Sequence, residues 1–186
     1  MLQGARHEHA EALYNAAMEL SVDIDVIPLR SEINNHDLKL DGLVLPGGES
    51  TTMRKASENH GLLSSIFTFI DNNPSIPILG TCAGAILLMD PKMGKEPYVD
   101  AKVDRNAYGR QKDSFEKDIR MENNKIFKGV FIRAPAITSI GNKTKPIAWA
   151  DDDIVGCIEG KNMALTFHPE LTNDLTFHKL WLERLK

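Results

Sequence analysis

The feature that most constrains the fold is the apolar stretch at residues 76–89, which contains the motif GTCAG at residues 80–84. The stretch is too short to cross a bilayer as a helix. Residues 76–79 are typical of a buried strand, and residues 83–89 are typical of a buried helix. A strand that passes directly into a helix is the repeating unit of parallel α/β sheets. We therefore expect the chain to fold around such a sheet.

Hydrophobic periodicity predicts alternating helices and strands in the first half of the chain and mostly strands in the second half. The predicted helices cover residues 7–20, part of 51–72 with a break near Gly61, 83–89 and 175–185. The predicted strands cover residues 22–28, 42–45, 76–79, 99–103, 130–132, 137–140, 147–149, 154–159 and 163–167. We find no repeat and no long linker, so we predict a single domain over residues 1–186. Its fold class is α/β, a three-layer, doubly wound mixed sheet with an antiparallel excursion.

The beginning of the sequence departs from this architecture. A doubly wound fold opens with an apolar strand before its first helix, but only Met1 and Leu2 precede Gln3-Gly4 here. We expect either that the first strand is truncated or that residues upstream of it lie outside this sequence.

Composition argues against several functions. Hydrophobic residues make up 42% of the 186 residues, enough for a core, and the net charge is −4. This balance provides no basic surface for nucleic acid or for an anionic membrane. We see no basic-then-apolar leader, and two cysteines do not make a disulfide framework. A cytoplasmic protein with free thiols is expected.

Cys82 lies at the centre of GTCAG, between a predicted strand and a predicted helix. This is the G-x-nucleophile-x-G elbow with cysteine in place of serine. Glycines flank the nucleophile because bulky neighbours would clash in so tight a turn, and the helix N-terminus favours the thiolate. A lone cysteine in an apolar turn is more often a structural residue. The strand, the glycines and the helix together favour a nucleophile.

His168 and Glu170 in the tripeptide His-Pro-Glu supply the base and the orienting group that a cysteine nucleophile needs. They are two residues apart at the end of a predicted strand, and side chains two apart in an extended chain lie on one side. Pro169 biases His168 toward an extended conformation. The alternative is a surface turn, and the tripeptide alone is weak evidence.

Residues 46–52 (PGGESTT) follow another predicted parallel strand. The glycines allow backbone N–H groups to face a ligand. We predict that one of these N–H groups and the N–H of Ala83 form an oxyanion hole for a tetrahedral intermediate, and in the reaction that we favour the first is the N–H of Gly48. A phosphate-binding loop is the alternative, but it would require a Gly-Lys-Ser/Thr sequence, which is absent.

Three arginines are candidates for binding the carboxylate of a substrate, since arginine binds carboxylates through two hydrogen bonds. They are Arg105, Arg110 and Arg133. His7 and His9 have no cysteine or carboxylate cluster at ligand spacing, so no metal site is predicted, and a solvated helix start is the favoured interpretation. Cys157 lies in an alternating strand and is interpreted as a core residue.

These motifs resemble those of the class I, or triad, glutamine amidotransferases, which have a flavodoxin-like fold. Four strings narrow the resemblance to the glutaminase subunits of pyridoxal 5′-phosphate synthases over nearly the whole chain. They are PGGESTT at 46–52, GTCAG at 80–84, RNAYGRQ at 105–111 with Ser114-Phe115, and FIRAP at 131–135.

The resemblance implies that Cys82, His168 and Glu170 form the triad and hydrolyse L-glutamine without a metal or organic cofactor. It implies that glutamine contacts Gly48, Glu49, Ser50, Arg105, Ile132 and Arg133. It also implies a partner, the synthase subunit that receives the ammonia. Three alternatives remain: the glutaminase subunit of another synthase, such as imidazole glycerol phosphate synthase; a cysteine peptidase-like or chaperone protein; and a binding subunit without activity.

Overall fold

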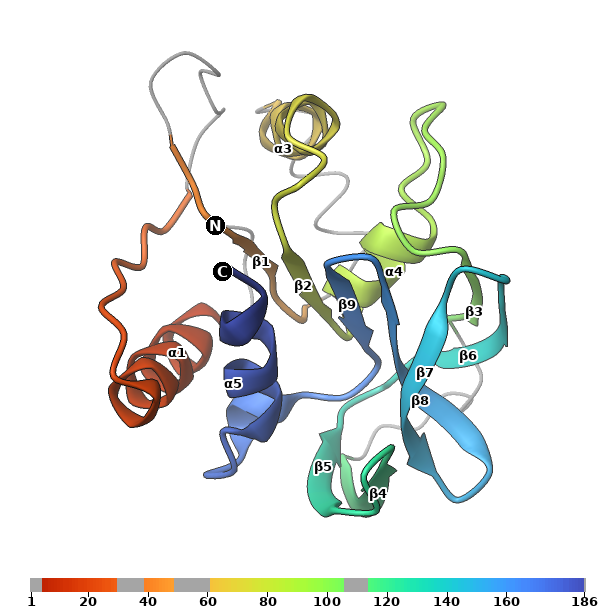
Figure 1. The fold of residues 1–186 in the computed structure, drawn as a ribbon. Coiled ribbons are helices and arrows are strands. Elements are labelled where there is room, and N and C mark those ends of the chain that lie inside the picture. The colour runs from red at the N-terminus through yellow and green to blue at the C-terminus, as the bar shows by residue number, and fades with distance from the viewer. Residues whose placement is uncertain (1–4, 30–38, 49–60, 106–113, 186) are drawn as a thin grey trace.

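Figure 1 shows the computed structural model of the chain, which describes residues 5–29, 39–48, 61–105 and 114–185. Its main sheet has seven strands in the order β1-β2-β9-β8-β7-β4-β5. The helices are α1 (Arg6–Leu20), α3 (Leu62–Asn72), α4 (Ala83–Met89), α5 (Thr176–Leu182), and the 3₁₀ helices η1 (Pro169–Leu171) and η2 (Glu183–Leu185). The strands are β1 (Leu43–Leu45), β2 (Ile78–Thr81), β3 (Ala101–Asp104), β4 (Phe115–Met121), β5 (Ile126–Phe131), β6 (Ala136–Ile140), β7 (Lys145–Ala150), β8 (Asp153–Glu159) and β9 (Asn162–Leu165).

Strands β1, β2 and β9 are parallel neighbours and form the part of the sheet that helices cover on both faces. In Figure 1, α3 and α4 lie on one side of these strands and α1 and α5 on the other. Alternation along the strands divides the core accordingly. Ile78 packs with the α3 and α4 side chains, whereas its neighbour Leu79 packs with α1 and α5. The predicted three-layer, doubly wound α/β fold is confirmed.

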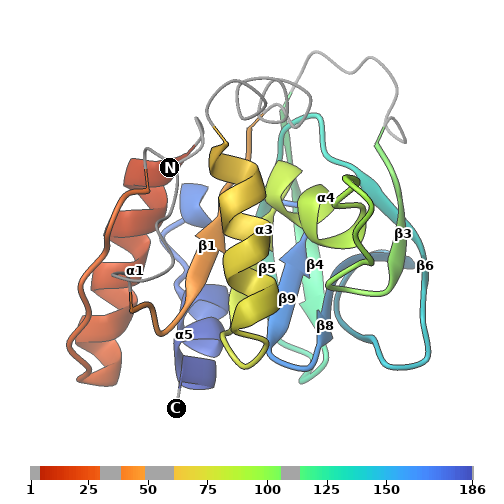
Figure 2. The ribbon, with the colours of Figure 1, turned by 90° about the horizontal axis from the view of Figure 1, so that it is seen from above.

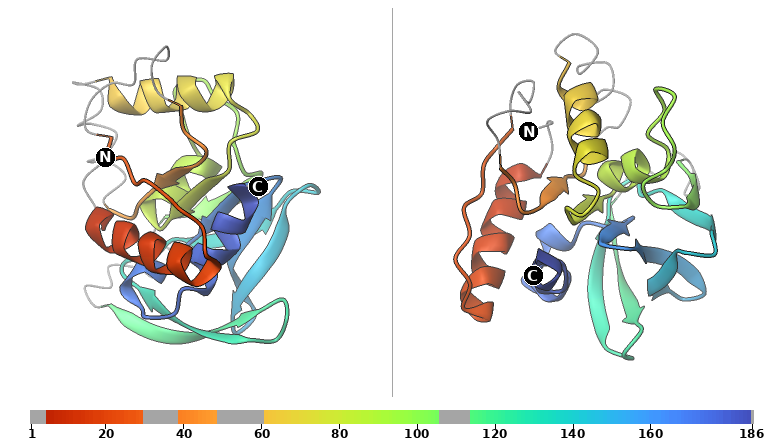
Figure 3. Two further views of the ribbon diagram at one scale, coloured as in Figure 1. Left: turned by 60° about the vertical axis from the view of Figure 1, so that its left-hand side comes forward. Right: turned by 45° about the horizontal axis from the view of Figure 1, so that its top comes forward.

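The second half of the chain forms the antiparallel part of the structure. Strands β9, β8, β7, β4 and β5 pair successively in antiparallel fashion. Figure 3 shows the β4–β5 ribbon extending away from α3 and α4. Strands β3 and β6 form a separate antiparallel pair, which Figure 2 shows at the flank of the molecule beside α4. The predicted antiparallel excursion is therefore present.

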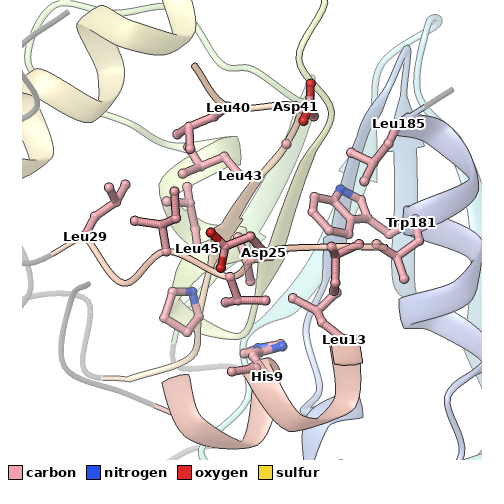
Figure 4. Close-up of a pocket in the computed structure, with 18 of the residues that line it drawn as sticks. His9, Leu13, Asp25, Leu29, Leu40, Asp41, Leu43, Leu45, Trp181 and Leu185 are labelled. Atoms are coloured by element: carbon pink, nitrogen blue, oxygen red, sulfur yellow. The ribbon is translucent and has the colours of Figure 1, made fainter. Parts of the chain in front are cut away.

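The strand predicted at residues 22–28 is wrong, because this segment is extended but belongs to neither sheet. Residues of this segment and of β1 line one hollow of about 530 Å³ (Figure 4). The segment thus faces β1 across open space rather than through strand pairing. Two backbone N–H groups of the segment donate to α1 instead of to a strand. The Val22 N–H donates to the carbonyl of Ala17, and the Val26 N–H donates to the Tyr14 hydroxyl.

Strand β4 was not predicted. Its sequence, FEKDIRM, places three charged residues in succession, and charged residues are depleted in strands. It forms because six consecutive residues pair with β5, a partner that local sequence does not reveal. Residues 51–60 of the predicted helical segment lie outside the described residues, and α3 begins after Gly61 as predicted.

No helix in the described parts of the chain is long and apolar enough to cross a membrane.

Candidate active site

Cys82 lies on a strained turn between β2 and α4. Its φ is 48° and its ψ is −106°, and positive φ is uncommon for a residue with a Cβ. The backbone holds this conformation because the Cys82 N–H donates to the carbonyl of Leu165 in β9, at 2.8 Å. Such strain persists only where the surrounding structure enforces it, and it clusters at functional sites. The predicted elbow is present in the structure.

The glycines of the elbow are required by close packing rather than by their φ values. A Cβ on Gly84 would lie 1.8 Å from the carbonyl oxygen of Leu45 in β1. A Cβ on Gly80 would lie 2.7 Å from the carbonyl oxygen of Gly84. Real Cβ atoms do not approach backbone this closely, so only glycine lets α4 pack against β1 and β2.

His168 and Glu170 follow β9, the strand next to β2. His168 Nδ1 and Glu170 Oε1 are 2.8 Å apart, and both side chains are buried. The geometry differs from the prediction, because residues 169–171 form a 3₁₀ turn with proline at its start rather than an extended chain. The His168 N–H donates to the carbonyl of Val130 in β5, at 2.8 Å, which fixes the start of the turn.

The protonation of the His168 imidazole depends on Cys82 and Glu170 as well as on burial. Burial favours the neutral ring, but the interactions with Cys82 and Glu170 outweigh burial and raise the pKa of His168 to about 10. Burial likewise opposes the charge of Glu170, yet its contacts with His168 and His9 lower its pKa. The described geometry therefore favours an imidazolium held between a cysteine sulfur and a carboxylate.

The residues proposed for the oxyanion hole lie on the same edge of the sheet. Strands β1, β2 and β9 are parallel, so the segments that follow them meet at their carboxyl ends. Gly47 follows β1, and a Cβ there would lie 2.3 Å from His168 Cε1. Gly48 is the next residue and is exposed. Ala83 begins α4, so its N–H has no acceptor within the helix.

The residues expected to bind glutamine are only partly described. Ile132 directs its carbonyl oxygen to within 3.9 Å of Cys82 Sγ. Arg133 follows it with φ at 44°, which is also uncommon for a residue with a Cβ, and Arg133 is exposed. Arg105 is half-buried at the end of β3. Glu49, Ser50 and Arg110 lie outside the described residues.

His9 was interpreted from the sequence as part of a solvated helix start, and this interpretation is wrong. Its side chain is completely buried. His9 Nε2 lies 3.0 Å from Thr81 Oγ1 and 3.3 Å from Glu170 Oε2, and His9 Nδ1 lies 3.1 Å from His178 Nε2. Helical spacing in the sequence could have indicated this burial, because His9 lies one turn before the buried Leu13 on the same face of the helix.

Within the described residues, no group of three or more histidine, cysteine or carboxylate side chains is arranged to hold a metal ion. Cys157 is free and fully buried, and burial raises the pKa of its thiol to about 12. It therefore packs in the core, in agreement with the interpretation of the sequence.

A cysteine on a strained strand–helix turn, next to an imidazole backed by a carboxylate, is the arrangement of enzymes that attack carbonyl carbon with sulfur. On a doubly wound mixed sheet, this arrangement defines the class of triad amidotransferases. The SNO glutamine amidotransferase family profile matches residues 1–186, and the chain belongs to this family. It is thus an enzyme of the glutaminase type.

Two relatives of similar length support the same assignment. The chain is 40% identical over 194 residues to the pyridoxal 5′-phosphate synthase subunit PdxT of Pyrococcus furiosus, covering 99% of this chain and 95% of that one. It is 40% identical over 190 residues to the PdxT subunit of Oenococcus oeni, covering 100% and 94%.

Solved structures agree with the fold. A crystal structure of a glutamine amidotransferase is 37% identical and superimposes with a TM-score of 0.79, covering 99% of this chain and 95% of that one. The structure of PurLQS from Thermotoga maritima is 16% identical with a TM-score of 0.58, covering 95% and 92%. The second similarity concerns the fold alone.

Proposed function

We propose that residues 1–186 form one glutaminase domain that hydrolyses L-glutamine to L-glutamate and ammonia. Cys82 is the nucleophile, His168 is the acid and base, and Glu170 orients His168. The observation that carries this proposal is the strained φ of 48° at Cys82 together with the 2.8 Å contact between His168 Nδ1 and Glu170 Oε1.

In the proposed reaction, the Cys82 thiolate attacks the side-chain carboxamide carbon of glutamine and forms a C–S bond. The N–H groups of Gly48 and Ala83 stabilise the oxyanion. The tetrahedral intermediate collapses as the C–N bond breaks, and the His168 imidazolium gives its proton to the departing nitrogen, which leaves as ammonia.

Water then attacks the thioester while His168 takes one of its protons. The C–S bond breaks, glutamate leaves and the thiolate is restored. His168 supports both steps if it starts protonated, and this is the state that its raised pKa favours. The chemistry needs a free Cys82 thiol, which fits a reducing compartment such as the cytoplasm.

Glutamine binding is assigned to Gly48, Glu49, Ser50, Arg105, Ile132 and Arg133. The position of Ile132 beside Cys82 Sγ supports the part of this set that follows β5. Arg105 or Arg133 is proposed to bind the α-carboxylate, since a guanidinium group matches its geometry.

The ammonia is proposed to pass to the synthase subunit of a pyridoxal 5′-phosphate synthase, in a hetero-oligomer with this chain. The support is that the relatives from Pyrococcus furiosus and Oenococcus oeni, each 40% identical over almost the whole chain, are named as subunits of that synthase.

The test is to co-purify the chain with the candidate synthase subunit, then to measure ammonia release from glutamine. His168→Asn is expected to lose nearly all activity, and Glu170→Gln is expected to lose less because it orients without transferring a proton. Residues that act as a unit are not additive, so the double variant is expected to be little worse than His168→Asn. Losses that simply multiply would contradict the triad.

A further inference from the structure

Glu170 of the proposed triad also contacts a buried pair of histidines, His9 and His178, through His9. His9 comes from the first turns of α1, and His178 comes from α5. Both side chains are completely buried, and their ring nitrogens are 3.1 Å apart. His9 therefore joins two helices to the carboxylate that contacts His168.

The two carboxylate oxygens of Glu170 have different partners: one contacts His168 and the other contacts His9. Oε1 contacts His168 Nδ1, whereas Oε2 is buried and has no well-formed hydrogen bond among the described residues. The contact that Oε2 does have is with His9 Nε2, at 3.3 Å. A buried carboxylate oxygen without a donor is costly, so removing the His9 N–H would leave Oε2 free to turn away.

The neighbours of His9 indicate which nitrogen carries its proton. Burial lowers the pKa of His9, against the opposing attraction of Glu170, so the ring is neutral with one N–H. A proton on Nε2 faces the Glu170 carboxylate and the Thr81 hydroxyl, both of which accept. Nδ1 then accepts from His178 Nε2, and burial lowers the pKa of His178 to about 3, which keeps that ring neutral too.

Thr81 makes this contact relevant to the nucleophile as well. It is the last residue of β2, it is completely buried, and it directly precedes Cys82. A single N–H of His9 therefore lies between the orienting carboxylate and the residue next to the nucleophile. The titratable groups that act on His9 are Glu170, His168 and Glu8, with His178 behind it.

We propose that His9 is a positioning residue of the glutaminase: its Nε2–H, shared between Glu170 Oε2 and Thr81 Oγ1, holds the carboxylate against His168 and fixes the start of the elbow. His9 acts through Glu170 and contacts no substrate. This inference rests on the proposed function, because the residue that His9 positions is the proposed orienting group.

The test uses three variants of the chain in complex with the synthase subunit. His9→Leu removes the N–H and keeps an apolar side chain. His9→Gln keeps a side-chain N–H donor of similar reach. Leu13→Ala, one turn along α1 and buried in the same core, is the control for a general loss of packing.

His9→Leu is expected to lower kcat about ten- to a hundredfold, the range for a lost hydrogen bond to a charged group. KM is expected to change less than twofold, because His9 contacts no substrate. His9→Gln is expected to recover kcat to within about fivefold of the parent. Leu13→Ala is expected to lower the melting temperature and leave kcat within about twofold.

A second measurement does not depend on glutamine hydrolysis. The rate at which iodoacetamide alkylates Cys82 is followed against pH in the same complexes. A loosened Glu170 stabilises the His168 imidazolium less, so the pH of half-maximal alkylation is expected to rise in His9→Leu by about one unit for a tenfold effect. It is expected to stay unchanged in Leu13→Ala.

The two proposals fail in different ways. A parent complex that releases no ammonia overturns the proposed function, while the alkylation profiles still decide the role of His9. A His9→Leu complex with unchanged kcat and an unchanged alkylation profile overturns the positioning role. Equal damage in His9→Gln and His9→Leu also overturns it, because the N–H would then be irrelevant.

Discussion

The strained backbone of Cys82 depends on how the neighbouring elements pack around it. A residue with a Cβ at a φ of 48° is held there by neighbours, and here the Leu165 carbonyl and the tight approach of Gly84 to β1 hold it. Cys82 Sγ lies 3.9 Å from the carbonyl oxygen of Ile132, and Cys82 also contributes to the raised pKa of His168. The two cysteines therefore differ in environment, although both are buried and free.

This difference leads to a prediction for the nucleophile. Cys82→Ala is expected to abolish ammonia release and leave the fold intact, because the sulfur is the proposed nucleophile. A glutamine analogue that alkylates thiols is expected to label Cys82 and spare Cys157, which is fully buried and has a raised pKa of about 12. Mass spectrometry of digested protein checks the labelling, and Cys157→Ala is the matched control. Equal labelling of both cysteines would contradict the assignment.

Gly47 is the residue at which the loop after β1 meets His168. A Cβ there would lie 2.3 Å from His168 Cε1, so Gly47→Ala must displace the imidazole or the loop. We expect at least a tenfold loss of kcat, about 1.4 kcal/mol. Gly94→Ala is the control. Its added Cβ would have no heavy atom within 4 Å, and only the φ of 71° would strain the alanine. It is expected to cost about 1 kcal/mol of stability and no activity. Normal activity in Gly47→Ala would mean that the loop relaxes freely.

At the scale of elements, α1 and α5 are joined through the His9–His178 contact. Burial lowers the pKa of both rings below the ordinary value of 6.5, to about 3 for His178. As the pH falls below 6.5 the unfolded chain binds protons that the folded chain does not, so the free energy of unfolding decreases. The loss continues until the pH reaches the folded pKa, which is about 3 for His178.

We therefore expect acid to destabilise the packing of α1 on α5, by up to about 1.4 kcal/mol per pH unit for each histidine. Urea unfolding between pH 7 and pH 4 measures this slope. His178→Gln is expected to reduce the slope, whatever its effect on stability at pH 7. A slope that His178→Gln leaves unchanged would show that other groups cause the acid sensitivity.

At the scale of the whole molecule, three parallel strands bring the proposed site together from separate parts of the chain. The segments after β1, β2 and β9 carry Gly47 and Gly48, the proposed nucleophile Cys82 and the proposed base His168. The β1 loop joins the site through Gly47 and Gly48. With no Cβ on either side, the peptide between them reverses its orientation at low cost. In one orientation the N–H of this peptide faces the reacting carbonyl of glutamine. In the other orientation the carbonyl group of the peptide faces it.

This flexibility leads to a prediction about the partner. Contact with the synthase subunit is expected to select the orientation that supports the tetrahedral intermediate. A missing oxyanion donor costs about 10²–10³ in rate. We therefore expect weak glutaminase activity from the isolated chain and at least a tenfold rise when the synthase subunit is added. Titrating the subunit into a coupled ammonia assay measures the rise. Full activity in the isolated chain, unchanged by the subunit, would contradict the prediction.

Features that depend on near neighbours could be predicted from the amino-acid sequence. The helix at residues 6–20 and the closeness of His168 to Glu170 follow from local sequence, because the interacting residues lie within a few positions of one another. The order of strand, turn and helix around Cys82 is local as well, although Leu165 in β9 and Leu45 in β1 hold the strained turn. The doubly wound architecture followed from the order of such units.

Features that depend on distant partners became visible in the folded chain. Strand β4 exists because β5 pairs with its charged residues, and residues 22–28 are not a strand because no strand in the described structure pairs with them. His9 looked solvated because Thr81, Glu170 and His178, which surround it, are 72 or more residues away. Which distant residues surround a side chain or pair with a strand is decided by the assembled fold, so local periodicity does not identify them.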